Sequence, residues 1–312
     1  MLRRMALRIG HGQMSDPIHF AKLSGSGNDF VCIDNRDGRH DALLGSAERA
    51  ARFAQVVCRR RLGVGADGVV FATPCASPEQ ADLGARHFEP DGSEAELCGN
   101  GTACFTRWVL HNGWMSKEEL KILTPGGVVL GRNSEGRYVR VCISLPRDMR
   151  MGLALEAGGT TLNCDFVITG VPHVVTYVDD VNAVDVASLG RAVRHHEKFK
   201  PRGANANFVQ VIREGELAMR TFEFGVEGET LACGTGSAAA AILAAARFGW
   251  HAEYTTAKRP VLVRARSGDV LRVYVARQED GVVSDLCLET VVRFIYGGTL
   301  NAEFAGQAMG GK

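Results

Sequence analysis

The stretch that decides the fold is GETLACGTGSAAAAILAAARFG, residues 228–249. Cys233 lies in a glycine-rich turn and directly precedes a helical pattern made almost wholly of alanine. A helix that is apolar on every side must be shielded from water, so this one is predicted to be buried inside its own sheet. A reactive thiol at the start of such a helix is unusual and raises the question of whether a second one faces it.

A second copy of the same unit lies earlier in the chain, FEPDGSEAELCGNGTACFTRWVLHNG, residues 88–113. It matches residues 222–249, and both copies run from a strand through a polar turn to a C-G-x-G turn and a helix that stops at a glycine. Cys98 and Cys233 hold matching positions. A supersecondary unit used twice predicts two similar halves, and we place their join near residue 136.

Outside the repeat, many short β-branched segments are separated by Gly, Pro, Asn or Asp, which is typical of strands. Helical patterns are few, namely Ala47–Arg60, Thr102–Leu110, Ala187–Arg194 and Ser237–Phe248. Many strands with few helices favour the α+β class over a regular alternating parallel sheet. The chain is divided into an N-terminal extension (1–16) that we expect to be disordered, a first half (17–136), a second half (137–290) and a return strand with a tail (291–312).

Composition narrows the class of partner. The 312 residues carry a net charge of +1, and no basic stripe or acidic tail is present, so neither nucleic acid nor a membrane surface is favoured. The longest apolar run has far fewer residues than the roughly 20 that a helical span needs. We expect a cytoplasmic protein, with a homodimer left open as its assembly and residues 1–16 left open as a leader or a misplaced start.

The nine cysteines contain no C-x-x-C pair, so neither a zinc site nor a disulfide framework is predicted. Cys32 and Cys142, set among alternating apolar residues, are interpreted as buried and inert thiols. The loop GVGADG, residues 63–68, matches a dinucleotide motif, but it follows a helical pattern and precedes a strand, which is the wrong context. No metal and no cofactor are therefore expected.

A C-G-x-G turn at a helix start offers three things. Its glycines let a ligand approach the backbone closely, and the first helical N–H groups are free to bind a carboxylate. The partial positive charge of the helix start also favours thiolate, so we expect it to lower the pKa of each cysteine. Two such turns facing one another would hold a carboxylate between them and place Cys98 and Cys233 on opposite faces of the adjoining carbon. One thiolate would then remove the α-proton while the other thiol returns one, which inverts the stereocentre.

With these residues in place, the chain resembles the diaminopimelate epimerase family over roughly residues 18–300. The motifs that carry the resemblance are SGSGNDF (24–30), RRLGVGADG (60–68), DGSEAELCGNG (91–101), GVPHVV (170–175), NANFV (205–209) and GETLACGTG (228–236). The resemblance implies two pseudo-symmetric halves, each a curled, mostly antiparallel sheet around a central helix, with the active site in the cleft between them. It also implies that the last strand returns to the first half from Val291 onward.

The resemblance assigns roles by position. Cys98 and Cys233 match the acid/base pair, and His173 and Glu223 match the residues that adjoin the thiols. The backbone donors to the reacting carboxylate would be Gly99, Asn100, Gly234 and Thr235. Further contacts with the substrate would come from the asparagines Asn28 and Asn205. At the distal end of the substrate, the contacts would come from Glu89 and Phe224.

Three departures from the family pattern concern the far end of the substrate. Glu89 and Val171 replace asparagines, and Phe224 replaces the arginine that grips the distal carboxylate. The sequence is therefore interpreted as an epimerase that converts LL- to meso-diaminopimelate, in lysine and cell-wall precursor synthesis, with its distal carboxylate bound by Arg202 or by one of residues 59–61. The alternative is a racemase of a basic amino acid such as lysine or ornithine.

Three more distant alternatives are kept. A non-catalytic amino-acid-binding homologue would retain the pocket without turnover. An isomerase of the phenazine-pathway type shares the expected fold but lacks the thiol pair. A thiol–disulfide redox protein would use the two cysteines for exchange, whereas we expect their oxidation to one another to inactivate.

Overall fold

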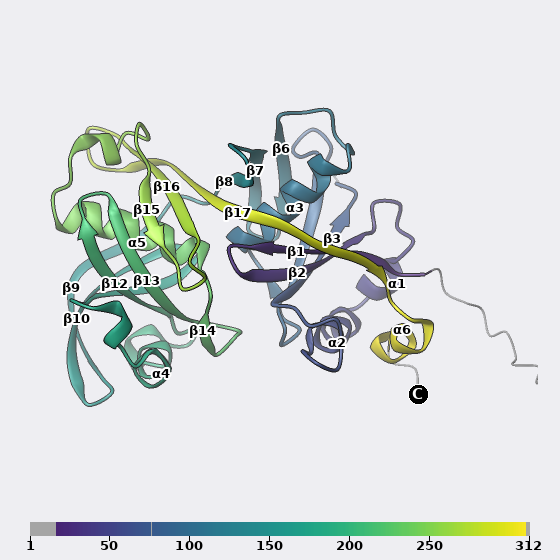
Figure 1. The fold of residues 1–312 in the computed structure, drawn as a ribbon, viewed down its shortest axis with the longest axis horizontal. Coiled ribbons are helices and arrows are strands. Elements are labelled where there is room, and N and C mark those ends of the chain that lie inside the picture. The colour runs from purple at the N-terminus through teal and green to yellow at the C-terminus, as the bar shows by residue number, and fades with distance from the viewer. Residues whose placement is uncertain (1–16, 76, 310–312) are drawn as a thin grey trace, which may run out of the picture.

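The computed structural model describes residues 17–75 and 77–309, so the predicted extension, residues 1–16, lies outside the described residues. Two halves lie side by side and are linked by one long strand, β17 (Val283–Thr299), which runs from one half into the other (Figure 1). Strands predominate and helices are few, which confirms the predicted α+β class. Among the described residues, no helix is long and apolar enough to cross a membrane.

The first half is a closed ring of paired strands around one helix, α3 (Gly99–His111). In order of pairing, the ring consists of β1 (His19–Gly25), β2 (Asn28–Asp34), β3 (Gly68–Thr73), β4 (Leu83–Phe88), β6 (Glu119–Thr124), β7 (Gly127–Asn133), β8 (Tyr138–Cys142) and the end of β17. The β2–β3 and β4–β6 pairings are parallel and the others are antiparallel. The short β5 (Glu94–Ala95) pairs with β4, and α1 (Asp41–Leu44), α2 (Ala47–Cys58) and α6 (Ala302–Met309) complete this half.

The second half has the same order of strands around α5 (Gly234–Arg247), but among the described residues no pairing between β9 and β17 closes its ring. Its pairings run through β9 (Arg147–Ala157), β10 (Thr160–Thr169), β11 (Val171–Tyr177), β12 (Asn205–Arg213), β13 (Glu216–Glu223), β15 (Val261–Arg264), β16 (Val270–Arg277) and the beginning of β17. β14 (Gly228–Thr230) pairs with β13 as β5 does with β4. The remaining elements are α4 (Val186–Arg194) and three single turns, η1 (Val181–Ala183), η2 (Glu197–Phe199) and η3 (Ala252–Tyr254).

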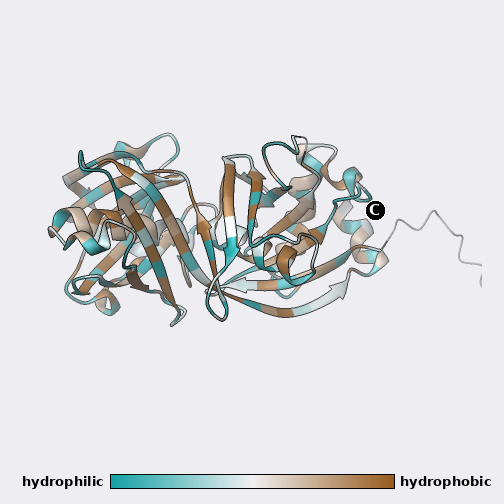
Figure 2. Cartoon of the chain, turned by 90° about the horizontal axis from the view of Figure 1, so that it is seen from above, coloured by the Kyte–Doolittle hydropathy of each residue, from teal (hydrophilic) through white to brown (hydrophobic). Residues whose placement is uncertain are grey.

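Sequence explains why α5 can sit inside a curled sheet. Every residue from Gly234 to Ala245 is buried, and alanine side chains lose no rotamer entropy while allowing the surrounding strands to approach closely. The helix ends where Gly249 adopts a left-handed φ of 61°, the usual conformation of a glycine just past a helix C-terminus. Hydrophobic and hydrophilic residues alternate along strands of both halves (Figure 2), as expected for sheets with one face on a core.

The two halves are connected by β8 and β17. The sequence placed the join near residue 136, and in the structure β8 still pairs with β7, so the chain passes to the second half after Cys142. β17 pairs with β16 up to Glu289 and with β1 from Val292 onward. The last strand thus belongs to both halves, and its Leu288 side chain lies against the starts of both central helices.

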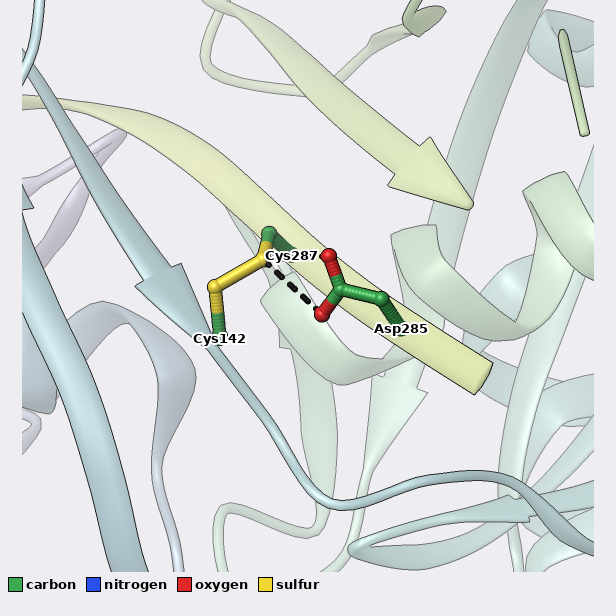
Figure 3. A group of neighbouring side chains, drawn as sticks. All are labelled: Cys142, Asp285 and Cys287. Carbon is green, nitrogen blue, oxygen red and sulfur yellow. Dashed lines mark hydrogen bonds between the residues drawn. A yellow bond between two sulfur atoms is a disulfide. The ribbon is translucent and has the colours of Figure 1, made fainter. Parts of the chain in front are cut away.

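One disulfide corrects the sequence analysis. Cys142 was predicted to be a free buried thiol, and no disulfide was expected, but Cys142 and Cys287 are bonded to one another (Figure 3). They are direct cross-strand partners of β8 and β17, with Cα atoms 3.9 Å apart. Their 145-residue separation hides this pairing from the sequence. Cys32, by contrast, is buried and free as expected.

The same disulfide bears on metal binding. Asp285 lies beside the pair, with an oxygen 3.5 Å from the Cys287 sulfur (Figure 3). Among the described residues, these three form the group whose ligand atoms are spaced closely enough to hold an ion. Because a cysteine binds a metal ion as its thiolate, the disulfide leaves the Asp285 carboxylate as the one available ligand of this group.

Candidate active site

Cys98 and Cys233 are the N-cap residues of the two central helices. Their backbones are nearly identical, with φ/ψ of −126°/114° and −125°/111°. Each sulfur accepts a hydrogen bond from the third residue of its helix, Cys98 from the Gly101 N–H at 3.4 Å and Cys233 from the Gly236 N–H at 3.3 Å. The sequence repeat is therefore also a repeat of local geometry.

Both cysteines line one cavity of about 220 Å³ between the halves. The two helix starts meet there: a Cβ added to Gly99 would lie 3.8 Å from the Cα of Gly234 and 3.9 Å from the Thr235 nitrogen. A Cβ at Gly234 would come within 2.6 Å of the Leu288 side chain on β17. A Cβ at Gly99 would meet the same Leu288 side chain at 3.0 Å. Glycine at both positions therefore leaves room for Leu288 and lets a ligand approach the bare backbone of the two helix starts.

The pKa shifts of the two thiols, Cys98 and Cys233, run in the opposite direction to the one expected from the sequence. Burial raises the pKa of Cys98 well above its ordinary value, and the neighbouring Glu89 carboxylate raises it further. Burial and Glu223 raise the pKa of Cys233 in the same way. The helix N–H groups do lower both pKa values, as predicted, but their effect is smaller than the cost of removing a thiolate from water. The predicted net lowering of the cysteine pKa is therefore wrong.

His173 lies next to Cys233 but reaches it through another residue. Its Nδ1 accepts from the Asn207 amide at 3.2 Å, so its Nε2 carries the proton and donates to the Thr235 hydroxyl at 3.0 Å. The Thr235 oxygen lies 3.7 Å from the Cys233 sulfur. Burial lowers the pKa of His173 to about 3, so the ring is neutral near pH 7. Its place in this relay suits a positioning role.

Glu223 lies close to Cys233. Its carboxylate accepts a hydrogen bond from the Thr230 hydroxyl, and its charge raises the pKa of the Cys233 thiol. Burial raises the pKa of Glu223 to about 7. A carboxyl group that gains and loses a proton near neutrality, in contact with an acid/base thiol, is suited to modulate the charge of that thiol.

The two predicted asparagines hold the cavity in different ways. Asn28 accepts a hydrogen bond of 2.7 Å from the Asn100 amide, and it donates weakly to Asp67 at 3.5 Å. Asn205 accepts from the Phe224 backbone N–H at 2.7 Å and so fixes the position of that residue. The Asn100 side-chain oxygen is buried without a hydrogen-bond partner, which leaves it available to a ligand ammonium.

The distal end of the cavity contains the residues that depart from the family pattern. Glu89, Val171 and Phe224 all line it, together with Arg202. Residues 59–61 were the other cations considered for the distal carboxylate. Arg60 is bound to Asp29 at 2.7 Å and to Asp67 at 2.9 Å, and neither Arg59 nor Arg61 is among the residues lining the cavity.

Sequence reasoning missed His87 and Asn207. A Cβ on Gly101 would lie 2.7 Å from the His87 ring, and one on Gly236 would lie 2.4 Å from the Asn207 amide oxygen. The two side chains therefore occupy equivalent places beneath the two helix starts. Burial lowers the pKa of His87 to about 4, and its Nε2 is buried without a partner. The available signals were that Asn207 lies within the NANFV motif (205–209) and that His87 directly precedes the repeated unit at 88–113.

The fold, with its two similar halves, is shared with solved proteins described as racemases, epimerases and phenazine biosynthesis proteins. A proline racemase from Agrobacterium radiobacter K84, described as probable, superposes with a TM-score of 0.70 at 15% identity over 94% of this chain and 96% of its own. A PhzF-family phenazine biosynthesis protein from Bacillus anthracis also gives 0.70, at 16% identity over 92% and 99%. At such identities the likeness concerns the fold alone.

Sequence similarity is more specific. The family described as diaminopimelate epimerase matches residues 20–141 and 166–285. Curated diaminopimelate epimerases from Aquifex aeolicus and Methanocella arvoryzae are 41% and 42% identical, over 82% and 73% of this chain and 89% and 81% of their own lengths. The chain belongs to the diaminopimelate epimerase family, as its motifs indicated, and it is an isomerase. These relatives do not favour the alternative of a racemase for a basic amino acid.

Proposed function

We propose that this protein interconverts LL- and meso-diaminopimelate by moving one proton at an α-carbon between Cys98 and Cys233. The observation that carries the proposal is that both thiols, each capping a central helix, line one cavity. Curated relatives that carry the name of this activity support the choice of substrate.

The reaction divides between the two faces of the α-carbon. One cysteine, as thiolate, takes the α-proton, and the electron pair left on carbon spreads into the carboxylate. The other cysteine, as thiol, delivers its proton from the opposite side and becomes the thiolate. No electrons are gained or lost, and the enzyme ends with its two protonation states exchanged. Because the sulfurs are coupled by charge, they titrate as a pair.

The helix starts stabilise the intermediate. The N–H groups of Gly99, Asn100, Gly234 and Thr235 belong to the first turns of α3 and α5 and lack intrahelical partners. Charge that develops on the carboxylate would meet these preorganised donors, each contributing about 3–4 kcal/mol. Burial raises the pKa of both cysteines, so the thiolate that takes the α-proton is harder to form than a thiolate in water but is a stronger base once it is formed.

A location in a reducing compartment, the cytoplasm, is part of this proposal. The mechanism requires Cys98 and Cys233 as free thiols, and both are free, which a pool of reduced glutathione and thioredoxin would maintain. The Cys142–Cys287 disulfide is of a kind that is rare in that compartment, so the proposal also requires this one bond to resist reduction there.

The test follows α-proton exchange by NMR in deuterated water with LL-diaminopimelate. Wild-type protein should exchange the α-proton and form the meso isomer, and Cys98→Ser and Cys233→Ser should each lower the rate by about 10²- to 10⁴-fold because serine is a far weaker acid and base. Lysine and ornithine serve as comparison substrates. Exchange with these but not with diaminopimelate, or unchanged rates in both variants, would refute the proposal.

A further inference from the structure

The distal end of the cavity has an unusual distribution of charge. Five carboxylates line the cavity, and among its described lining residues the single Lys or Arg is Arg202. The carboxylates are Asp67, Glu89, Glu94, Glu96 and Glu223. A dicarboxylate substrate entering this cavity needs a cation for its second carboxylate, because an unpaired buried charge is costly.

Most of these carboxylates already have partners. Asp67 is paired with Arg60 at 2.9 Å, and Glu94 with Arg86 at 2.7 Å. Glu223 is engaged by Thr230 and Cys233. Glu89 takes part in no salt bridge among the described residues, although its carboxyl group lines the cavity. Burial and the nearby Glu223 raise the pKa of Glu89 to about 8, which is the behaviour of a carboxyl group that lacks a cation.

Arg202 is held firmly by its backbone but loosely by its side chain. The buried Arg194 donates to the Arg202 carbonyl oxygen at 2.9 Å, and the Arg194 guanidinium also packs on the Phe224 ring, 4.4 Å from its centre. Arg202 and Phe224 are therefore parts of one anchored unit. Within residues 17–75 and 77–309, the Arg202 guanidinium makes a single long ion pair, 3.6 Å to Glu96, with both side chains about half exposed. Such a pair contributes little and can be exchanged for a ligand carboxylate.

We propose that Arg202 binds the carboxylate, and Glu89 the ammonium group, of the unreacting end of the substrate. This assignment rests on the proposed function, because diaminopimelate carries both groups on its second stereocentre. It also accounts together for the replacement of an arginine by Phe224 and of an asparagine by Glu89. Arg202 lies in the loop before β12 and Glu89 follows β4, and both line the same cavity, so one end of a substrate can meet a cation and an anion together.

Two substrate analogues separate the two contacts. 2-Aminopimelate retains the distal carboxylate but lacks the distal ammonium, and lysine retains the ammonium but lacks the carboxylate. Both should act as competitive inhibitors of diaminopimelate epimerisation. Arg202→Gln should raise the inhibition constant of 2-aminopimelate and the KM of diaminopimelate by about 10- to 100-fold, with little change for lysine. Glu89→Gln should weaken lysine and leave 2-aminopimelate nearly unchanged.

Two control variants isolate the role of Arg202. Glu96→Gln removes its resting partner, so KM should stay constant or fall; an equal rise in Glu96→Gln and Arg202→Gln would mean that the pair merely closes the cavity mouth. Arg259→Gln alters an exposed arginine bound to Glu253 and should have no effect. If wild-type protein epimerises diaminopimelate but Arg202→Gln binds both analogues normally, the inference fails while the proposed function stands. Absence of wild-type turnover would instead overturn the proposed function.

Discussion

The relay from His173 through Thr235 to Cys233 gives the sharpest test of how the structure supports catalysis. Thr235→Val keeps the shape of the side chain and removes its hydroxyl. The His173 ring is fully buried, so its Nε2–H would lose the acceptor now 3.0 Å away. An unsatisfied buried donor costs about 1–3 kcal/mol of unfolding free energy.

The same substitution removes a donor to the Cys233 sulfur. At 3.7 Å this is a weak contact, and its loss should destabilise the thiolate by about 1 kcal/mol, which lowers kcat/KM roughly fivefold. Because His173 has a pKa of about 3, it stays neutral from pH 6 to 9, so the fold-change should be constant over that range.

The assay combines urea unfolding with steady-state kinetics across pH 6–9. Thr235→Ser keeps a hydroxyl at this position and is the matched control. It should retain most of the unfolding free energy and most of the kcat/KM that Thr235→Val loses. The role given to the Thr235 hydroxyl would be refuted if Thr235→Val matched wild type in stability and kcat/KM. It would also be refuted if Thr235→Ser lost as much stability and kcat/KM as Thr235→Val.

Three further predictions concern a carboxyl group, the disulfide and a glycine. The pKa of Glu89 is about 8 in the native state, against an ordinary value of 4.5, so the native state keeps a proton that the unfolded chain has lost, and the free energy of unfolding falls as pH rises from about 4.5 to 8. In chemical unfolding at pH 9, Glu89→Gln should restore up to about 5 kcal/mol of this free energy, and less where cavity water screens the charge. A gain in stability seen only at pH 4 would contradict this. Titration of the unfolded, unreduced protein should find seven free thiols, the number in the described structure, and nine free thiols without reductant would rule out the disulfide. Reduction of Cys142–Cys287 should lower the free energy of unfolding by at most about 5 kcal/mol for a loop of this length. Gly234→Ala should lower kcat/KM because its Cβ meets Leu288 at 2.6 Å, whereas Gly306→Ala, with open space around it, should not.

Helix positions show where local patterns succeed. The sequence predicted helices from Thr102 and from Ser237, and the structure begins them at Gly99 and Gly234. The difference arises because the first turn of each helix contains glycines, which have poor helix propensity. These residues therefore show no helical pattern in the sequence, although the cysteine before them caps the helix. Strands β1, β6 and β9 were not predicted. β9 has exposed residues over most of its length, and it therefore lacks the alternation by which strands are recognised.

The sequence by itself determined the duplicated unit, the burial of the alanine helix and the identity of the two thiols, because each is a local pattern or a repeat of one. It also gave the residues around the cavity through their motifs. The tertiary structure alone decided that Cys98 and Cys233 share a cavity, that Cys142 meets Cys287 and that Arg202 is the cation at the distal end. It also reversed the expected direction of the cysteine pKa shifts. These properties depend on distances between residues far apart in the chain and on how much water the assembled halves exclude, and neither quantity is encoded in any local stretch.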